Sequence, residues 1–177
     1  MVESNAYSEL HYREWCSPVK SITSFYREKG ACMETKLNQE MVRELWSRTY
    51  NTSGKPDWSH LFPYYHDDII FQDSIQRVEG RADFEALCNR LSNRCQELRM
   101  DIIDLSQTGN SIFLQWEMTM MFKKYPSSTL YGCSKLTLND DGLIITQRDY
   151  YDLWGDIFDN IPRFGKAYRK FMHRKFG

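Results

Sequence analysis

The sequence lacks any long apolar segment. No run of hydrophobic residues approaches the roughly 18 that a membrane-spanning helix requires, so we expect no stable membrane insertion. Residues 1–12 are polar and mixed in charge, without the apolar stretch of a secretory signal. The sequence also lacks a glycine-rich phosphate-binding loop and a nucleophile elbow. It has no Cys/His pair in the context of a catalytic dyad. These absences argue against membrane proteins and against several motif-defined enzyme classes.

Cysteine is scarce and odd in number. A disulfide-stapled fold needs a dense set of cysteines, and a zinc site needs Cys or His ligands at close spacing. Neither pattern is present, and His60 and His66 have no ligand partner at suitable spacing. We therefore expect no metal, no cofactor and a cytoplasmic location. The five cysteines are Cys16, Cys32, Cys88, Cys95 and Cys133.

Basic charge is scarce outside the C-terminal segment. The net charge is −1, but six of the 23 Lys and Arg residues lie between 163 and 175, so 17 basic residues face 24 acidic ones elsewhere. A nucleic-acid partner is excluded, because a duplex binder needs a broad basic face. The basic segment carries Phe164, Tyr168 and Phe171 on one stripe. It either docks that stripe on the domain or binds an anionic membrane surface.

Aromatic residues are abundant, at 15% of the 177 residues. That content and length suit one domain with a single substantial core. The patterns predict an N-terminal extension over residues 1–35, a main domain over 36–160 and a basic C-terminal helix over 161–177. Within the extension, residues 19–29 have a helical pattern.

The periodicity predicts helices first and strands afterwards. Apolar residues at three-to-four spacing indicate helices over 37–50 and 81–98, with a short one over 57–62 between them. Alternating or apolar runs indicate strands over 67–73, 100–105, 111–122, 129–138 and 143–153. Residues 154–177 are again helical, with a break at Ile161-Pro162. This order is typical of an α+β domain whose helices pack on one face of a mostly antiparallel sheet.

Carboxylates stand at alternate positions in the apolar strands. A period of two places Asp73, Glu117 and Asp149 on strand faces that also carry apolar residues. If these faces line a hollow, burial and mutual repulsion raise the carboxyl pKa values toward the range that general acid–base catalysis needs. Alternatively, Glu117 and Asp149 face outward or pair with Lys135 and Arg148.

Several passages resemble a known family. The chain over residues 37–160 is similar to the SnoaL-like branch of the nuclear-transport-factor-2-like superfamily. That family forms a cone, in which a strongly curved mixed sheet wraps around helices and encloses a deep apolar pocket. It includes steroid isomerases, limonene-epoxide hydrolases, polyketide cyclases, dehydratases and non-enzymatic binding modules. The similar passages are Phe71-Gln-Asp73, Val78-Glu-Gly-Arg81, the strand around Trp116, Asp141-Gly142 and Arg148-Asp-Tyr-Tyr-Asp152.

The resemblance implies roles for individual residues. Asp73 falls where ketosteroid isomerases keep the aspartate that moves a proton between carbons. The isomerase oxyanion tyrosine and protonated aspartate would align near Trp46 and Ser134. Asp149 falls on a catalytic aspartate of the limonene-epoxide hydrolases. The Arg-x-Asp of their other strand becomes Gln115-Trp-Glu117, and their water-holding Tyr and Asn fall on Phe71 and Asp73.

The alternating carboxylates and the family resemblance together predict an enzyme that acts on a hydrophobic small molecule. The resemblance implies a cofactor-independent reaction of the isomerase, cyclase or hydrolase type. The expected catalytic residues are Asp73, Asp149 and Glu117, with Gln115, Tyr131 and Ser134 as hydrogen-bond donors. The aromatic residues expected to line the pocket are Trp46, Tyr50, Phe71, Phe113 and Tyr151. The alternative is a non-catalytic ligand-binding or dimeric module. A homodimer through the sheet face fits both, with Trp116, Met118 and Met120 as interface residues in the module.

Overall fold

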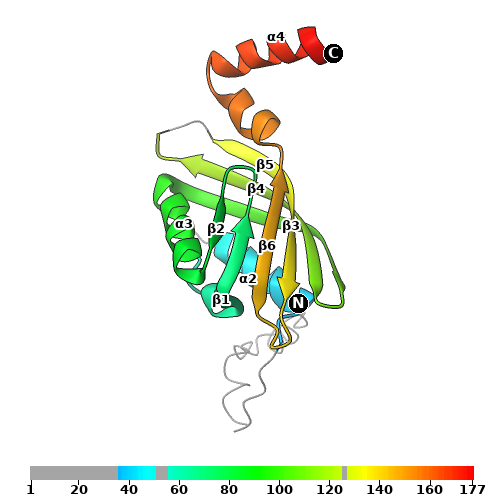
Figure 1. Ribbon diagram of the computed structural model, residues 1–177. Helices are drawn as coiled ribbons and strands as arrows, with labels where there is room; N and C mark the ends of the chain where they lie inside the picture. Colours follow the sequence, from blue (N-terminus) through cyan, green and yellow to red (C-terminus); the bar gives the residue numbers. More distant parts are fainter. Residues whose placement is uncertain (1–35, 51–55, 125–126) are drawn as a thin grey trace, which may run out of the picture. The chain divides into compact units, whose positions relative to one another are not determined.

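One six-stranded sheet carries the fold, in the order β2-β1-β6-β5-β4-β3 (Figure 1). It belongs to a computed structural model that describes residues 36–50, 56–124 and 127–177. The chain divides into two units, 1–34 and 35–177, and all described residues lie in the second. Neighbouring strands are antiparallel except β1 and β6, which are parallel. The strands are β1 (Tyr65–Gln72), β2 (Arg77–Glu79), β3 (Cys95–Thr108), β4 (Ser111–Phe122), β5 (Ser128–Leu138) and β6 (Ile144–Tyr151).

Two amphipathic helices precede the long strands. In α2 (Gln39–Tyr50), Val42 and Trp46 are buried one turn apart. In α3 (Arg81–Arg94), Phe84, Leu87 and Cys88 form the buried face. Shorter elements are η1 (Phe62–Tyr64), η2 (Leu153–Ile157) and η3 (Phe158–Asn160), and α4 (Phe164–Phe176) follows Pro162. None of the described helices has the length and apolarity needed to cross a membrane.

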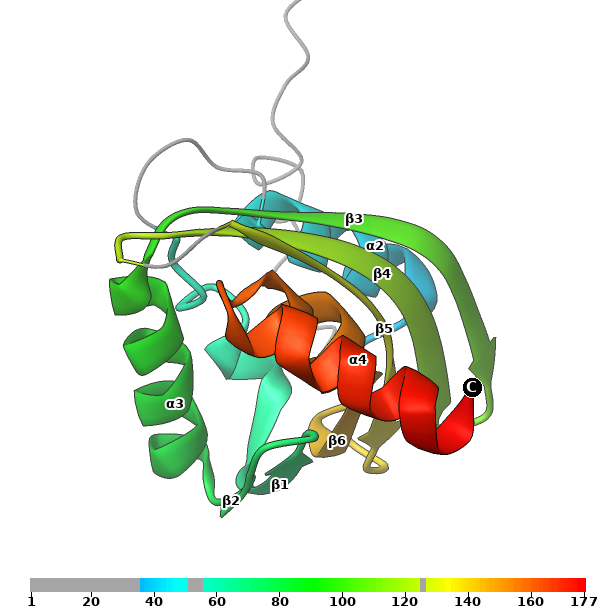
Figure 2. The same cartoon turned by 90° about the horizontal axis from the view of Figure 1, so that it is seen from above.

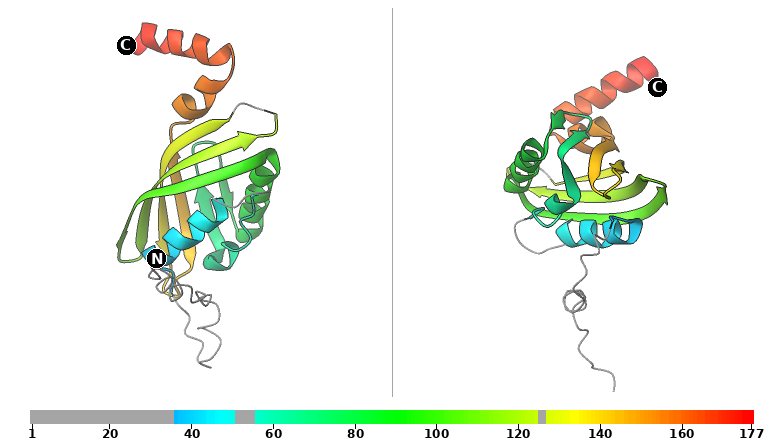
Figure 3. Two further views of the ribbon diagram at one scale, coloured as in Figure 1. Left: turned by 180° about the vertical axis from the view of Figure 1, so that it is seen from behind. Right: turned by 60° about the horizontal axis from the view of Figure 1, so that its bottom comes forward.

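The sheet is strongly curved. β3 and β4 pair over almost their whole lengths, with register shifts between Cys95 and Glu97 and between Ile102 and Asp104. Such bulges bend the strand that carries them and increase its twist. Figure 2 shows β3, β4 and β5 following this curve with α3 at its open side, and Figure 3 shows the same arrangement from behind. The curvature gives the sheet a concave face, which holds the cavity described below.

Aromatic packing joins both helices to β1. The ring of Tyr65 lies 4.6 Å from that of Phe84 on α3 and 6.4 Å from that of Trp46 on α2, between centroids. Phe71 also contacts Phe84, at 5.3 Å. Tilted pairs at these distances are favourable beyond the apolar area they bury. The cluster holds α2 and α3 at the concave side of the sheet.

The expected cone-shaped α+β fold is confirmed, and the differences are local. The helix expected to reach residue 98 ends at Arg94, because β3 already begins at Cys95 and pairs with Phe122. The helix expected over 57–62 is a turn followed by η1, and β2 has too few residues to show a period. The helical pattern over 19–29 lies outside the described residues.

Candidate active site

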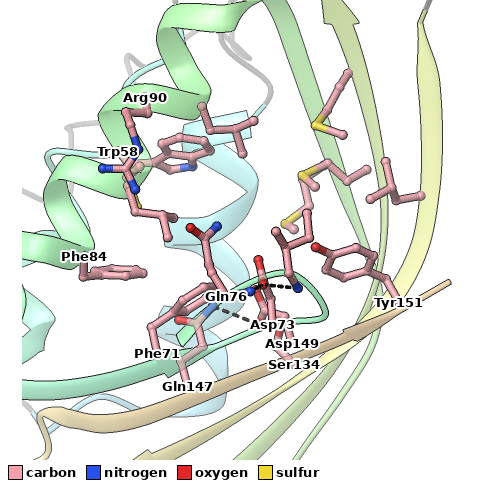
Figure 4. A pocket seen from close by; sticks show the side chains of 18 of the residues that line it. Trp58, Phe71, Asp73, Gln76, Phe84, Arg90, Ser134, Gln147, Asp149 and Tyr151 are labelled. Carbon is pink, nitrogen blue, oxygen red and sulfur yellow. Dashed lines mark hydrogen bonds between the residues drawn. The ribbon is translucent and has the colours of Figure 1, made fainter. Parts of the chain in front are cut away.

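The concave side of the sheet holds an apolar cavity of about 370 Å³ (Figure 4). That volume lies within the range of small-molecule sites. β4 contributes the inward-facing Trp116, Met118 and Met120, and α3 contributes a face around Leu87. The polar side chains in the lining are few. They include Tyr65, Asp73, Gln76, Cys88, Arg90, Arg94, Ser134, Gln147, Asp149 and Tyr151.

Two carboxylates meet in this lining because β1 and β6 run parallel. The register pairs Phe71 with Gln147 and Gln72 with Arg148. The next residues in this register are Asp73 and Asp149, which therefore lie side by side. Both line the cavity. Figure 4 shows the two side chains close together at one end of the site.

Asp149 is held by a hydrogen-bond network in which the donor and the acceptor of each bond are determined. Its Oδ1 accepts from Ser134 Oγ at 2.6 Å and from Gln147 Nε2 at 3.0 Å. Trp116 Nε1 donates to Ser134 Oγ at 2.9 Å, and Tyr65 OH donates to Gln147 Oε1 at 2.6 Å. Because an indole nitrogen can only donate, the Ser134 proton is directed to the carboxylate. Asp149 is therefore placed by four side chains that are themselves fixed.

The environment of Asp149 raises its pKa to about 6, from an ordinary 3.8. Burial is the largest cause, and the nearby charge of Asp73 acts in the same direction. The hydrogen bonds from Ser134 and Gln147 lower the pKa, as does Arg148, but burial outweighs them. A carboxyl with a pKa near neutrality can both accept and return a proton under physiological conditions.

Asp73 is fixed by the turn that follows β1. Its Oδ1 accepts hydrogen bonds from the backbone N–H groups of Ile75 and Gln76, both at 2.7 Å. The Tyr151 phenol also lines the cavity, and its pKa is raised by burial first and then by the nearby charges of Asp73 and Asp149. The phenol therefore stays protonated and has a proton to donate.

Two further features bear on the chemistry of the site. Burial raises the pKa of the Cys88 thiol to about 12, and the Asp149 charge adds to the effect. Cys88 is therefore a protonated thiol rather than a nucleophile. Within the described part of the chain, no three His, Cys, Asp or Glu side chains are grouped to hold a metal ion.

The structure places most of the predicted inner residues in the cavity. Trp46, Phe71 and Ser134 line it together with Asp73, Asp149 and Tyr151. The Ser134 hydroxyl donates to Asp149, so its proton is already used. Tyr50 ends α2, but its side chain lies outside the described part of the structure.

The prediction of which face of β4 points into the cavity was wrong. Gln115 and Phe113 are exposed and Glu117 is half-buried, and none of them lines the cavity. Tyr131 on β5 also faces outward and is 61% exposed. The reason is that Leu114, Trp116 and Met120 fill the concave side and force the alternate residues to the outer face.

The same reversal corrects two related expectations. Trp116, Met118 and Met120 line the cavity, so they are not outer-face interface residues. The anticipated ion pairs of Lys135 and Arg148 do not form either. Lys135 Nζ lies 5.6 Å from the Phe113 ring centroid, and the Arg148 guanidinium lies 5.2 Å from that of Tyr150.

The network around Asp149 contains residues that the sequence did not single out as site residues. Tyr65 and Gln147 are 82 positions apart, and Trp116 and Ser134 are 18 apart. One signal was present in the sequence. The largest apolar side chains of β4 share one phase, which favours that phase for the inner face.

Comparisons with known proteins agree with this architecture. A family model described as SnoaL-like domain matches residues 46–147. The sequence has no significant match among curated proteins. Many solved structures are similar.

Three of these structures represent different branches of the fold. An LEH-like epoxide hydrolase from M. tuberculosis has 17% identity and a TM-score of 0.56, with 75% of this chain and 97% of that chain covered. A Catenulispora acidiphila protein with a ketosteroid isomerase-like fold, in complex with trimethylamine, has 13% identity and a TM-score of 0.59, over 70% and 93%. A putative SnoaL-like polyketide cyclase from Jannaschia has 20% identity and a TM-score of 0.53, over 65% and 88%. At these identities the likeness shows a shared fold.

Proposed function

The chain belongs to the SnoaL-like domain family, and from that premise we propose that it is a small-molecule enzyme using carboxylate general acid–base catalysis. The substrate is a hydrophobic compound bound in the cavity, and the reaction is of the isomerase, cyclase or hydrolase type. One observation carries the proposal. Asp149 has a pKa of about 6 while fixed in a mainly apolar cavity.

Asp149 acts as the general base through Oδ2. Oδ1 is occupied by Ser134 and Gln147, and no residue of the described ranges hydrogen-bonds Oδ2. In its ionised form the carboxylate removes a proton from a substrate carbon or from an attacking water. The carboxylic acid so formed returns that proton later in the reaction. Similar structures are named as an epoxide hydrolase, a putative isomerase and a putative polyketide cyclase, so the fold does not by itself decide among these reactions.

Asp73, Tyr151 and Gln76 complete the site in this proposal. Asp73 places a second carboxylate near Asp149, and its charge helps to keep the Tyr151 phenol protonated. Gln76 also lines the cavity, and its side-chain amide makes no hydrogen bond to the described residues. Its N–H groups are therefore free to stabilise negative charge that develops on a substrate oxygen. Ser134 positions Asp149 and is not an oxyanion donor.

A carboxyl titration by NMR on labelled protein tests the central observation. We expect one side-chain carboxyl to titrate near pH 6 and to disappear in the Asp149→Asn variant. Cyclic enones, epoxides and lactones are the substrates to screen. Turnover of any of them should be lost in Asp149→Asn and retained in Glu117→Gln, whose side chain lies outside the cavity. Titration of Asp149 in the ordinary carboxyl range contradicts the proposal.

A non-catalytic binding or dimeric module is the second candidate, and the outer face of the sheet favours it. Phe113, Tyr131 and Tyr150 are 45–61% exposed there, and exposed aromatic patches commonly mark contact surfaces. We propose that a second copy of the chain covers this face. Sedimentation velocity should then show a dimer in the wild type and a monomer in Tyr131→Ser/Tyr150→Ser.

The cytoplasmic location stays a prediction. It was based on the cysteine content, and the thiols of Cys88, Cys95 and Cys133 are free.

A further inference from the structure

Two arginines of α3 line the cavity without a charged partner. Arg90 and Arg94 lie one helical turn apart, and both contribute to the lining. Among the described residues, neither guanidinium forms an ion pair or hydrogen bond. By contrast, several arginines elsewhere are paired with acids. These pairs are Arg48–Glu44, Arg77–Glu79, Arg81–Asp67, Arg99–Asp101 and Arg169–Asp159.

The local sequence explains why these two cations stay unpaired. No acidic residue occurs between Glu85 and Glu97, and Glu85 lies 3.7 Å from Arg81. A further cation, Lys123, lies close to the C-terminal end of α3. Lys123 Nζ donates to the carbonyl of Asn93, and its backbone N–H donates to the carbonyl of Arg94. This side of the cavity therefore carries the two guanidinium groups, with Lys123 close by outside the lining.

The two ends of the cavity have opposite charge. Figure 4 shows Arg90 at one end of the site and Asp73 and Asp149 at the other. Apolar side chains, including Met118 and Met120, also line the cavity. An anionic group is attracted to the arginines and repelled by the carboxylates, so the charge pattern sets the direction in which an anionic ligand enters.

We propose that the ligand of this cavity is an amphiphilic carboxylic acid. Arg90 and Arg94 bind its carboxylate, since guanidinium groups match carboxylate geometry with paired N–H donors. The hydrophobic body then lies along the apolar lining, and its far end faces Asp149. This inference rests on the proposed function and adds the substrate class and the binding direction.

Binding of two matched probes tests the inference. Octanoate carries the carboxylate, and 1-octanol has the same chain length without the charge. Isothermal titration at pH 7 and low salt should show octanoate binding about tenfold more tightly than 1-octanol. In Arg90→Gln/Arg94→Gln, octanoate should lose about that factor while 1-octanol changes less than about twofold. Arg90→Lys/Arg94→Lys keeps the charge and should retain part of the preference.

Arg99→Gln is the matched control, because Arg99 pairs with Asp101 and is absent from the cavity lining. It should leave both affinities unchanged. Equal binding of octanoate and 1-octanol by the wild type overturns the carboxylate site but leaves the acid–base proposal standing. Failure of both probes to bind, with Asp149 still titrating near pH 6, overturns the ligand class alone. Loss of the Asp149 titration overturns the proposed function.

Discussion

Strands β4 and β6 carry similar alternating patterns and use them in opposite ways. On β6, Gln147 and Asp149 face the cavity, whereas on β4, Gln115 and Glu117 face outward or lie half-buried outside it. Alternation fixes which residues share a face but not which face is the inner one. The apolar volume on the opposite phase decides that question. On β4 this volume is large and includes Trp116, while on β6 the opposite phase begins with the buried Ile144 and continues with Thr146, Arg148 and Tyr150.

Gly132 lies on β5, between β4 and β6. Because it has no side chain, it leaves room for the inward-facing ring of Trp116. It pairs with Trp116 on β4 and with Tyr151 on β6. The rings of these two residues lie 6.3 Å apart. A Cβ at Gly132 would lie 2.4 Å from the Trp116 ring and 2.7 Å from the Tyr150 carbonyl oxygen. A glycine in the middle of a strand thus marks the place where the indole packs against the backbone.

Gly132→Ala should give the largest effect, because it removes the space that keeps Trp116 inward. Overpacking of this kind costs about 3 kcal/mol when backbone as well as side chains must move. We expect urea denaturation to show a free energy of unfolding that is lower by that amount. The hydrogen bond from Trp116 Nε1 to Ser134 Oγ should also weaken. Cys133→Ala, at an exposed neighbouring position, is the control and should be near neutral. A fully stable Gly132→Ala would show that β4 keeps its phase without this space.

Asp149→Asn should stabilise the fold at neutral pH. The folded-state pKa of about 6 lies above the ordinary 3.8, so the folded protein binds this proton more tightly than the unfolded chain. The free energy of unfolding should therefore fall as the pH rises from about 4 to about 6, by about 3 kcal/mol at most. Asn keeps an oxygen for Ser134 and carries no charge to bury. The variant should lack this pH dependence and exceed the wild type at pH 7.5, as urea denaturation across pH will show.

Equal slopes for Asp149→Asn and wild type between pH 4 and 6 would contradict that account. Asp140→Asn serves as the control, because Asp140 is exposed in the turn before β6. It should leave the wild-type slope unchanged. Together, the two variants test whether a carboxylate that faces inward from β6 is kept at the expense of stability.

Ser134→Ala should shift the Asp149 titration without unfolding the protein. The Ser134 hydroxyl stabilises the ionised carboxylate, so its removal should raise the Asp149 pKa further, by about one unit. Ser134→Thr keeps a hydroxyl and should stay closer to the wild type. Carboxyl NMR titration measures both. An unchanged or lowered pKa in Ser134→Ala would show that the hydrogen bond does not reach the carboxylate in solution.

The sequence predicted local structure well and long-range contacts poorly. The expected strand over 111–122 coincides with β4, because turn residues bound it on both sides. Asp73 and Asp149 were expected to face the pocket from β1 and β6, and both line the cavity. The phase of β4 was missed because its polar residues were given more weight than its larger apolar ones. The hydrogen bond between Tyr65 and Gln147 joins residues that only the fold brings together. The place of Arg90 in the cavity lining also depends on the fold, because the sequence does not show whether a helical arginine faces a cavity or the solvent.

Glu117→Gln should give the smallest effect and so sharpens the difference between the strands. Glu117 pairs across the sheet with Tyr131, which faces outward, and its side chain does not line the cavity. We expect a change in unfolding free energy within about 0.5 kcal/mol and no shift of the Asp149 titration. The two measurements are urea denaturation and carboxyl NMR on the variant. A clear shift of the Asp149 pKa would mean that Glu117 reaches the cavity after all, and that alternation on β4 follows its polar residues as it does on β6.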